Sequence, residues 1–177
     1  TRAAGGLFTR EDLRNYQVVE REPVVAEVAG HRVVSAAPPS SGGVALVQIL
    51  RMLAAKDYAD RDRLTRMHLQ IEAMRRAYRD RAVYLGDTDY VDVPLDRLTS
   101  RDYAAGLAAT IHPERALPSE YLPGPPAARK GPHTTHFSVI DAEGNRVAAT
   151  LSINYPFGSG FVAGDTGVVL NDEMDDF

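Results

Sequence analysis

The sequence predicts an α+β fold, because the spacing of its apolar residues changes along the chain. Between residues 44 and 111, apolar side chains recur every three or four positions, which is the period of amphipathic helices. From residue 134 onward, apolar and polar side chains alternate, which is the period of half-buried strands. Residues 113–133 separate the two regions and are rich in proline and glycine, so they predict a mobile loop or linker.

The composition is that of a globular protein and excludes several classes of function. The 177 residues are 44% apolar and carry a net charge of −4, without the basic stripe that binds nucleic acid. No apolar run approaches the length needed to span a membrane. The absence of cysteine excludes disulfides, thiol catalysis and thiolate metal sites. Because the sequence starts with Thr and stops at Asp-Asp-Phe, we expect it to be a piece of a longer protein.

Local motifs predict the elements of the first forty residues. Thr9 followed by Asp12 has the spacing of a capping box, which predicts a short helix that ends near Tyr16. Two apolar runs, residues 24–28 and 32–35, flank Ala-Gly-His and predict a β-hairpin. The run APPSSGG that follows predicts a turn. It lacks the GK[ST] ending of a phosphate-binding loop, so we reject that function for it.

A helix is predicted to start at Val44. Leu46, Leu50 and Leu53 fall on one stripe of this helix, which Val47 and Ile49 broaden, and the pattern predicts that the helix is well buried. Residues 101–111 predict a weaker, alanine-rich helix.

The strongest helical pattern of the chain begins at residue 64 and ends at Gly86. Five apolar residues share one face of this helix: Leu64, Met67, Ile71, Met74 and Tyr78. Glu72 and Arg76 pair on the opposite side at the i,i+4 spacing. His68 and Glu72 have the spacing of a zinc-binding helix, but the second histidine of such a helix is absent. We therefore interpret this pair as a structural ion pair or hydrogen bond.

A second hairpin is predicted at residues 134–153, where the alternating pattern begins. Asp-Ala-Glu-Gly-Asn at residues 141–145 predicts its turn. A glycine loop at residues 157–160 and a short buried strand at residues 167–170 follow it.

Thr134 and Thr135 open this hairpin between His133 and His136. A threonine hydroxyl is a poor nucleophile unless a base accepts its proton, and the α-amino group of a chain-terminal threonine is such a base. This amine has a pKa of about 7.7–8.0, which is close to the working pH. Cleavage in the loose segment before Thr134 would create that arrangement. The alternative is that both threonines are ordinary strand residues.

Thr150, Ser152 and Asn154 lie on one face of the second strand, because side chains alternate along a strand. Two hydroxyls and an amide on a core face would each need a hydrogen-bond partner. In a folded hairpin this face can lie beside Thr134. The alternative is that it forms a solvated edge.

Four acidic residues lie within residues 171–176, Asn-Asp-Glu-Met-Asp-Asp. Such a cluster can hold a substrate ammonium or a calcium ion, or it can form a solvated turn. It lacks the ligand and glycine spacing of an EF-hand loop.

Several segments, in the same order, resemble the γ-glutamyltransferase (γ-glutamyltranspeptidase) family of N-terminal-nucleophile hydrolases. They run through nearly the whole chain: GGLFTREDLRNY, APPSSGGVALVQIL, HLQIEAMRRAYRDRAVYLGD, TTHFSVIDAEGN, NYPFGSG and TGVVLNDEMDDF. The last three are the most specific of these matches.

This resemblance implies an αββα sandwich, made as one precursor that cuts itself between His133 and Thr134. Residues 1–133 would then be the C-terminal part of the large subunit, with residues 113–133 as the linker before the cut. Residues 134–177 would be the N-terminal part of the small subunit.

The resemblance also implies roles for individual residues. Thr134 is the self-cleaving group and the catalytic nucleophile. Ser152 supports it, at a position where the family commonly has threonine. Asn154, Glu173 and Asp176 bind the α-amino group of the γ-glutamyl moiety, and carboxylates are suitable partners for an ammonium.

The implied reaction uses no metal and no organic cofactor. Its substrate is glutathione or a related γ-glutamyl amide, and an amino acid, a peptide or water accepts the γ-glutamyl group. In this family the oxyanion-hole glycines and the groups that bind the substrate carboxylate lie downstream of, or outside, the present residues. We therefore expect the isolated fragment to have little or no activity. The resemblance also implies a periplasmic or secreted location.

Two alternatives come from other classes of function. One is a related N-terminal-nucleophile enzyme with another acyl specificity, such as a cephalosporin acylase or a capsule-anchoring transpeptidase. The other is a non-catalytic homologue that acts as a binding module through the acidic turn, with calcium binding as a weaker version.

Overall fold

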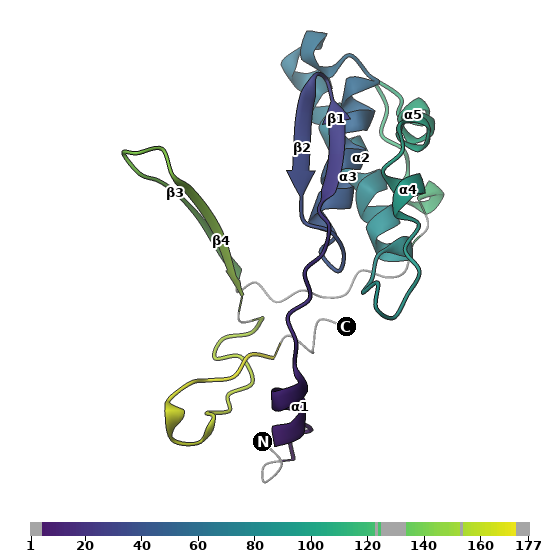
Figure 1. The fold of residues 1–177 in the computed structure, drawn as a ribbon. Helices are drawn as coiled ribbons and strands as arrows, with labels where there is room; N and C mark the ends of the chain where they lie inside the picture. The colour runs from purple at the N-terminus through teal and green to yellow at the C-terminus, as the bar shows by residue number, and fades with distance from the viewer. Residues whose placement is uncertain (1–4, 123, 125–133, 153, 173–177) are drawn as a thin grey trace. The chain divides into compact units, whose positions relative to one another are not determined.

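The computed structural model describes residues 5–122, 124, 134–152 and 154–172 (Figure 1). The chain divides into two compact units, one formed by residues 19–126 and the other by residues 1–18 together with 127–177. The helices and strands of these units confirm the α+β fold. None of the described helices has the length and apolar character needed to cross a membrane.

A β-hairpin opens the larger unit, as its two apolar runs predicted. Strand β1 (Val24–Val28) pairs antiparallel with β2 (His31–Ser35). Ala29 and Gly30 connect them with φ angles of 48° and 78°, the left-handed values that tight hairpin turns require. Alternate residues of β1 are buried, and the hairpin contacts helix α2.

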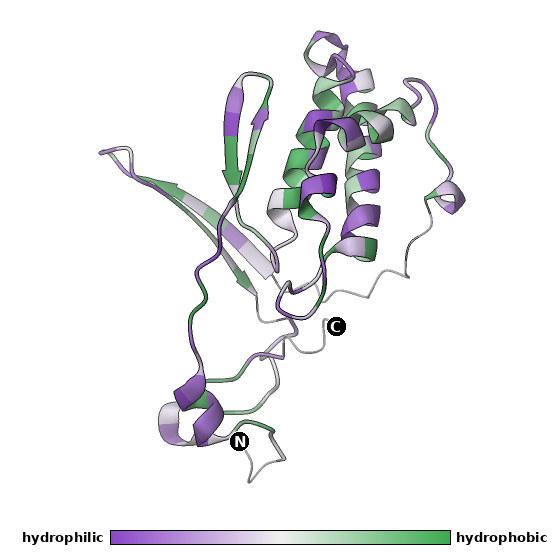
Figure 2. Ribbon diagram, turned by 45° about the vertical axis from the view of Figure 1, so that its right-hand side comes forward, coloured by the Kyte–Doolittle hydropathy of each residue, from purple (hydrophilic) through white to green (hydrophobic). Residues whose placement is uncertain are grey.

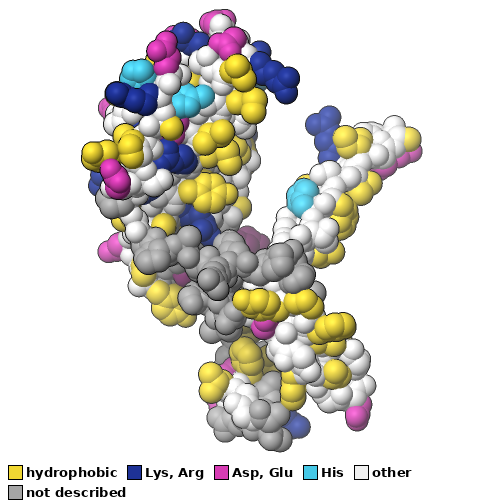
Figure 3. All heavy atoms as spheres, turned by 180° about the vertical axis from the view of Figure 1, so that it is seen from behind, with side chains coloured by type: hydrophobic (Ala, Val, Ile, Leu, Met, Phe, Trp, Pro, Cys, Tyr) yellow, Lys and Arg dark blue, Asp and Glu magenta, His cyan; other side chains and the backbone are white. Residues whose placement is uncertain are grey.

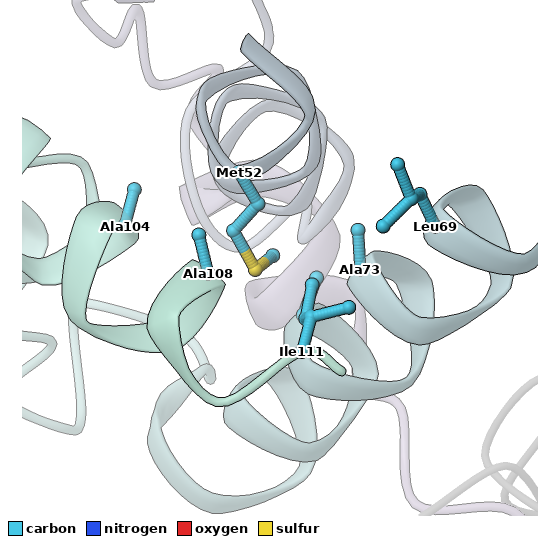
Figure 4. Packing of buried hydrophobic residues seen from close by; sticks show 7 residues of the cluster. Met52, Leu69, Ala73, Ala104, Ala108 and Ile111 are labelled. Carbon is cyan, nitrogen blue, oxygen red and sulfur yellow. The ribbon is translucent and has the colours of Figure 1, made fainter. Parts of the chain in front are cut away.

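Helix α2 (Gly42–Ala54) is central to the larger unit, because it contacts the hairpin and three other α-helices. These are α3 (Arg63–Tyr84), α4 (Leu95–Leu98) and α5 (Arg101–Ala109). Two apolar clusters result: one joins β1 to α2 and α4, and the other joins α2 to α3 and α5 around Met52 (Figure 4). Single 3₁₀ turns complete the described helices, at Tyr58–Asp60, Ser119–Tyr121 and, in the smaller unit, Gly164–Thr166.

The buried face of α2 coincides with only part of the predicted stripe, at Val47. Its most buried side chains are Val44, Val47, Gln48 and Met52. Leu46 is 42% exposed, and Leu50 and Leu53 are only partly buried. The helix is buried as expected, but the hairpin and α3 cover positions adjacent to the leucine stripe.

Gly43 is required where α2 begins beside the end of β2. A Cβ atom at this position would lie 2.2 Å from the carbonyl oxygen of Ala36. That separation is far inside van der Waals contact, so any larger residue would have to displace backbone.

The apolar stripe of α3 does not face the core of the larger unit. All five residues of the apolar stripe are exposed, from 39% for Met74 to 76% for Leu64. The face that meets α2 and α5 carries Leu69, Ala73 and Ala77 together with charged residues, and Figure 2 shows hydrophobic and hydrophilic residues mixed along these helices. Exposed hydrophobic side chains are visible on the surface in Figure 3.

The charged residues on the buried face of α3 satisfy one another. Glu72 is 1% exposed and pairs with Arg76 at 2.8 Å and with Arg75. Arg76 also donates to the side-chain and main-chain oxygens of Thr110, at 2.7 and 2.8 Å. Burial by itself raises the pKa of Glu72, but the hydrogen bonds from Arg76 and Arg75 outweigh it and hold that pKa below its ordinary value. The predicted Glu72–Arg76 pair therefore exists, as part of the core.

The smaller unit contains the second predicted hairpin. Helix α1 (Arg10–Asn15) has the expected capping box, with Thr9 and Asp12 each accepting from the other's main chain. Strand β3 (Thr134–Ile140) pairs antiparallel with β4 (Arg146–Ser152), and the turn between them is closed by hydrogen bonds between Asp141 and Asn145.

The short buried strand predicted at residues 167–170 is wrong. One isolated bridge joins Val169 to Val162, and Val168 and Val169 are both exposed. Among the described residues of this unit, no helix or strand covers the apolar residues Val168 and Val169.

Candidate functional site

The polar face of the β3–β4 hairpin brings Thr134 and Ser152 together. The strand register places these two residues directly opposite each other. The hydroxyl of Thr134 donates a hydrogen bond of 2.9 Å to Oγ of Ser152. The two hydroxyls meet because hairpin pairing aligns the first residue of β3 with the last residue of β4.

The same face continues with further polar pairs. A hydrogen bond of 2.8 Å joins Nδ1 of His136 to the hydroxyl of Thr150, and Nε2 of His136 lies 3.4 Å from the hydroxyl of Ser138. The opposite face of the hairpin is apolar and exposed, and it includes Phe137, Val139, Val147 and Leu151. The period of two thus separates a hydroxyl-rich face from an apolar one.

Asn154 is held immediately beyond β4. It is only 4% exposed, and its φ of 58° is a left-handed value that asparagine tolerates better than most residues. Its backbone N–H donates to Oγ of Ser152 at 3.3 Å. Its side-chain Nδ2 donates to the main-chain carbonyl of Asp172 at 3.2 Å. Asn154 therefore joins Ser152 to the start of the acidic segment.

Asp172 is tied to the same turn through its side chain. The backbone N–H of Tyr155 donates to Oδ1 of Asp172 at 3.4 Å. Nearby, the N–H and hydroxyl of Ser159 both donate to the carbonyl of Leu170, each at 3.0 Å. A Cβ atom on Gly158 would lie 2.4 Å from that same carbonyl. The glycine loop thus packs closely on the chain leading to Asp172.

Three of the predicted site residues lie outside the described residues. They are His133, on the amino side of the expected cut, and Glu173 and Asp176 of the acidic run. The cut between His133 and Thr134 and the acidic part of the ammonium site therefore stay predictions.

The residues considered for metal binding have structural partners. His68 Nε2 makes a hydrogen bond of 2.8 Å with the carbonyl of His112, and Glu72 is engaged by two arginines. In the part of the chain that the structure describes, no three His, Cys, Asp or Glu residues gather in a metal-binding arrangement.

The sequence interpretation missed two features of this site, the anchoring of Asn154 by Asp172 and the His136–Thr150 pair. The second could have been found, because both residues lie on the polar face at paired positions of the predicted hairpin. The contact between Asn154 and Asp172 depends on left-handed backbone at Asn154 and Phe157, and the spacing of apolar residues cannot predict such backbone angles.

Comparisons with known proteins give consistent results. The family model described as "Gamma-glutamyltranspeptidase" matches residues 1–177. The glutathione hydrolase proenzyme of Escherichia coli K12 is 45% identical over 98% of this chain and 30% of its own length. The acylase ACY 1 proenzyme of Pseudomonas sp. SE83 is 37% identical over 99% of this chain and 31% of its own length. The chain thus spans about 30% of the length of such curated relatives.

Solved structures agree with these matches. The gamma-glutamyltranspeptidase of Helicobacter pylori is 43% identical, with a TM-score of 0.62 over 66% of this chain and 34% of that one. The cephalosporin acylase of Bacillus halodurans is 26% identical, with a TM-score of 0.77 over 99% of this chain and 31% of that one.

Proposed function

The chain belongs to the gamma-glutamyltranspeptidase family, and on this basis we propose that it carries the nucleophile of a self-cleaving enzyme that hydrolyses glutathione and transfers its γ-glutamyl group. The observation that supports this proposal is the hydrogen bond between Thr134, at the head of β3, and Ser152. This bond orients a hydroxyl at the residue where the family resemblance expects the nucleophile.

In the self-cleavage step, Oγ1 of Thr134 attacks the carbonyl carbon of His133. The new C–O bond forms as the C–N bond breaks, and the hydroxyl proton ends on the nitrogen of Thr134. The resulting ester is hydrolysed by water, which leaves a carboxylate on His133 and a free α-amino group on Thr134.

That amino group then serves as the base for catalysis. It accepts the proton of Oγ1 as this oxygen attacks the γ-amide carbonyl of the substrate, and it passes the proton to the departing amine. A γ-glutamyl ester remains on Thr134. Water hydrolyses this ester, or the amine of an amino acid or peptide accepts the acyl group. No metal and no organic cofactor takes part in this proposal.

Ser152 and Asn154 have separate roles in this scheme. Ser152 accepts the hydrogen bond that orients the nucleophile, and a serine can do so as well as the threonine that is common at this position. Asn154, with Glu173 and Asp176, binds the substrate α-ammonium. Charge-assisted hydrogen bonds from an ammonium to carboxylates are stronger than neutral ones, which favours this donor over a neutral group.

The proposed cut makes residues 1–133 part of the large subunit and residues 134–177 part of the small subunit. We further propose a periplasmic or secreted location. The isolated chain has little or no activity, because the oxyanion donors and the groups for the substrate carboxylate come from elsewhere in the protein. Removal of a single oxyanion donor typically lowers kcat by about 10²–10³-fold.

Intact mass and N-terminal sequencing of the full-length protein test this proposal. The wild type should yield a small subunit that starts at Thr134, and Thr134→Ala should remain uncut and fail to hydrolyse γ-glutamyl-p-nitroanilide. Thr135→Ala is the matched control, because Thr135 lies on the other face of β3, and it should still be cut. Cleavage at this bond in Thr134→Ala would refute the assignment.

A related acylase is the second candidate, because two acylases match nearly the whole chain. Hydrolysis rates of the full-length enzyme on γ-glutamyl-p-nitroanilide and on N-acyl cephalosporins separate the two activities. A single uncut band with no hydrolysis of either substrate would instead favour the non-catalytic binding module.

A further inference from the structure

We propose that Asp172 is a positioning residue for the substrate ammonium site, because it fixes the orientation of the Asn154 amide. This inference rests on the proposed function, since it concerns how Asn154 meets a γ-glutamyl substrate. Asp172 acts through Asn154 and does not itself touch the reacting atoms.

The first step is the state of Asn154. Its side chain is almost fully buried and its backbone is left-handed, so it occupies one position rather than sampling solvent. An amide side chain has a donor end and an acceptor end, and only its partners decide which end points outward. The ligand that Asn154 can bind therefore depends on the groups that occupy its other end.

The second step is the carbonyl of Asp172. Nδ2 of Asn154 donates one of its two N–H groups to it at 3.2 Å, which turns the donor end of the amide toward Asp172. Among the described residues, no hydrogen bond engages the acceptor end, Oδ1, so it can accept from a ligand. A substrate ammonium is such a donor, whereas a carboxylate at this position would face an oxygen.

The third step is the side chain of Asp172. Its Oδ1 accepts from the backbone N–H of Tyr155 at 3.4 Å. Asp172 therefore makes hydrogen bonds with two consecutive residues of the turn, Asn154 and Tyr155. The carboxylate holds Tyr155 while the main-chain carbonyl holds Asn154. Without the carboxylate of Asp172, the backbone that carries its carbonyl loses the hydrogen bond to Tyr155 that holds it beside Asn154.

These contacts belong to one continuous network. Thr134 donates to Ser152, Ser152 also accepts from the N–H of Asn154, and Asn154 donates to Asp172. The nucleophile is therefore connected through Ser152 to Asn154 of the predicted ammonium site, and Asp172 holds the far side of Asn154. A rigid connection sets the distance between the attacking oxygen and the bound ammonium, which is what positioning a γ-amide requires.

The test uses the full-length protein with the variants Asp172→Ala and Asp172→Asn. Asp172→Ala should raise KM for γ-glutamyl-p-nitroanilide about 3- to 10-fold, the range expected for one lost hydrogen bond, with kcat changed less than twofold. Asp172→Asn should restore KM to within about twofold, because the amide oxygen still accepts from Tyr155. Asp165→Ala, at an exposed aspartate of the same segment, is the control and should leave both constants unchanged.

A double-mutant cycle separates positioning from a general structural effect. If Asp172 acts through Asn154, the KM increases of Asp172→Ala and Asn154→Ala should not multiply in the double variant. Fully multiplicative effects, or a wild-type KM in Asp172→Ala, would overturn the inference. Self-cleavage and a retained kcat show that each variant is folded.

The two proposals fail differently. A wild-type protein that hydrolyses no γ-glutamyl compound overturns the proposed function and this inference with it. An active wild type with an Asp172→Ala variant of unchanged KM overturns the inference about Asp172 alone.

Discussion

Ser152→Ala removes a single oxygen that accepts from two donors of the proposed site. One donor is the hydroxyl of Thr134 at 2.9 Å, and the other is the backbone N–H of Asn154 at 3.3 Å. A hydrogen bond contributes about 0.5–1.5 kcal/mol net, so the two together contribute about 1–3 kcal/mol. Because each 1.36 kcal/mol corresponds to a tenfold change in rate, we expect kcat to fall about 5- to 150-fold.

Two measurements on the full-length protein check this prediction. A time course of subunit formation reports the self-cleavage rate, and hydrolysis of γ-glutamyl-p-nitroanilide by the cleaved enzyme reports kcat. Both rates should fall in Ser152→Ala. Ser152→Thr keeps the hydroxyl and should stay near the wild type, since a β-branched residue suits a strand.

Ser138→Ala is the matched control for this substitution. Ser138 lies on the same face of the hairpin as Ser152, and among the described residues its side chain makes one hydrogen bond, of 3.4 Å, with Nε2 of His136. It should change neither rate by more than twofold. If Ser152→Ala also cleaves and turns over within twofold of the wild type, the hydrogen bond to Thr134 has no role in the chemistry and the reasoning fails.

The remaining predictions concern the larger unit. Glu72→Ala leaves Arg76 with an unpaired buried charge and should lower the free energy of unfolding by about 3–5 kcal/mol in urea denaturation; a loss under 1 kcal/mol would contradict the buried ion pair. Because the folded-state pKa of Glu72 lies below its unfolded value, its stabilising contribution is present above the unfolded pKa, about 4.3, and is lost as the pH falls through the folded pKa. The acid side of a stability profile should therefore be flatter in Glu72→Gln than in the wild type. Gly43→Ala places a Cβ against the carbonyl of Ala36 and should cost about 1–3 kcal/mol by the same urea assay, whereas exposed Gly106→Ala, which meets no atom within 4 Å, should not destabilise the protein.

The two hairpins could be predicted because their information is local. Alternation sets which side chains share a face, and turn residues set the register, so pairing of Thr134 with Ser152 follows once the β3–β4 turn closes. The capping box before α1 is equally local, and it formed as expected between Thr9 and Asp12. In each case the interacting residues lie close in the sequence.

The helices show the limit of this reasoning. Periodicity identified α3, but it could not tell which face meets the core of this unit. The face that packs on α2 and α5 contains alanines and a buried charge network with Thr110, whereas the apolar stripe that includes Ile71 is exposed. An amphipathic pattern states that two faces differ, and only the neighbouring elements decide which of them is covered.

The sequence by itself determined the main helices, both hairpins and the hydroxyl-rich face that begins at Thr134, because these follow from repeat periods and short-range turns. The tertiary structure alone decided the burial of Glu72 with Arg76 and the attachment of Asn154 to Asp172. The burial of the Glu72–Arg76 pair and the contact between Asn154 and Asp172 both depend on how separate segments approach one another. The left-handed backbone at Asn154 brings it to Asp172, and long-range packing around α2 buries Glu72 and Arg76. Neither feature produces a periodic pattern in the sequence.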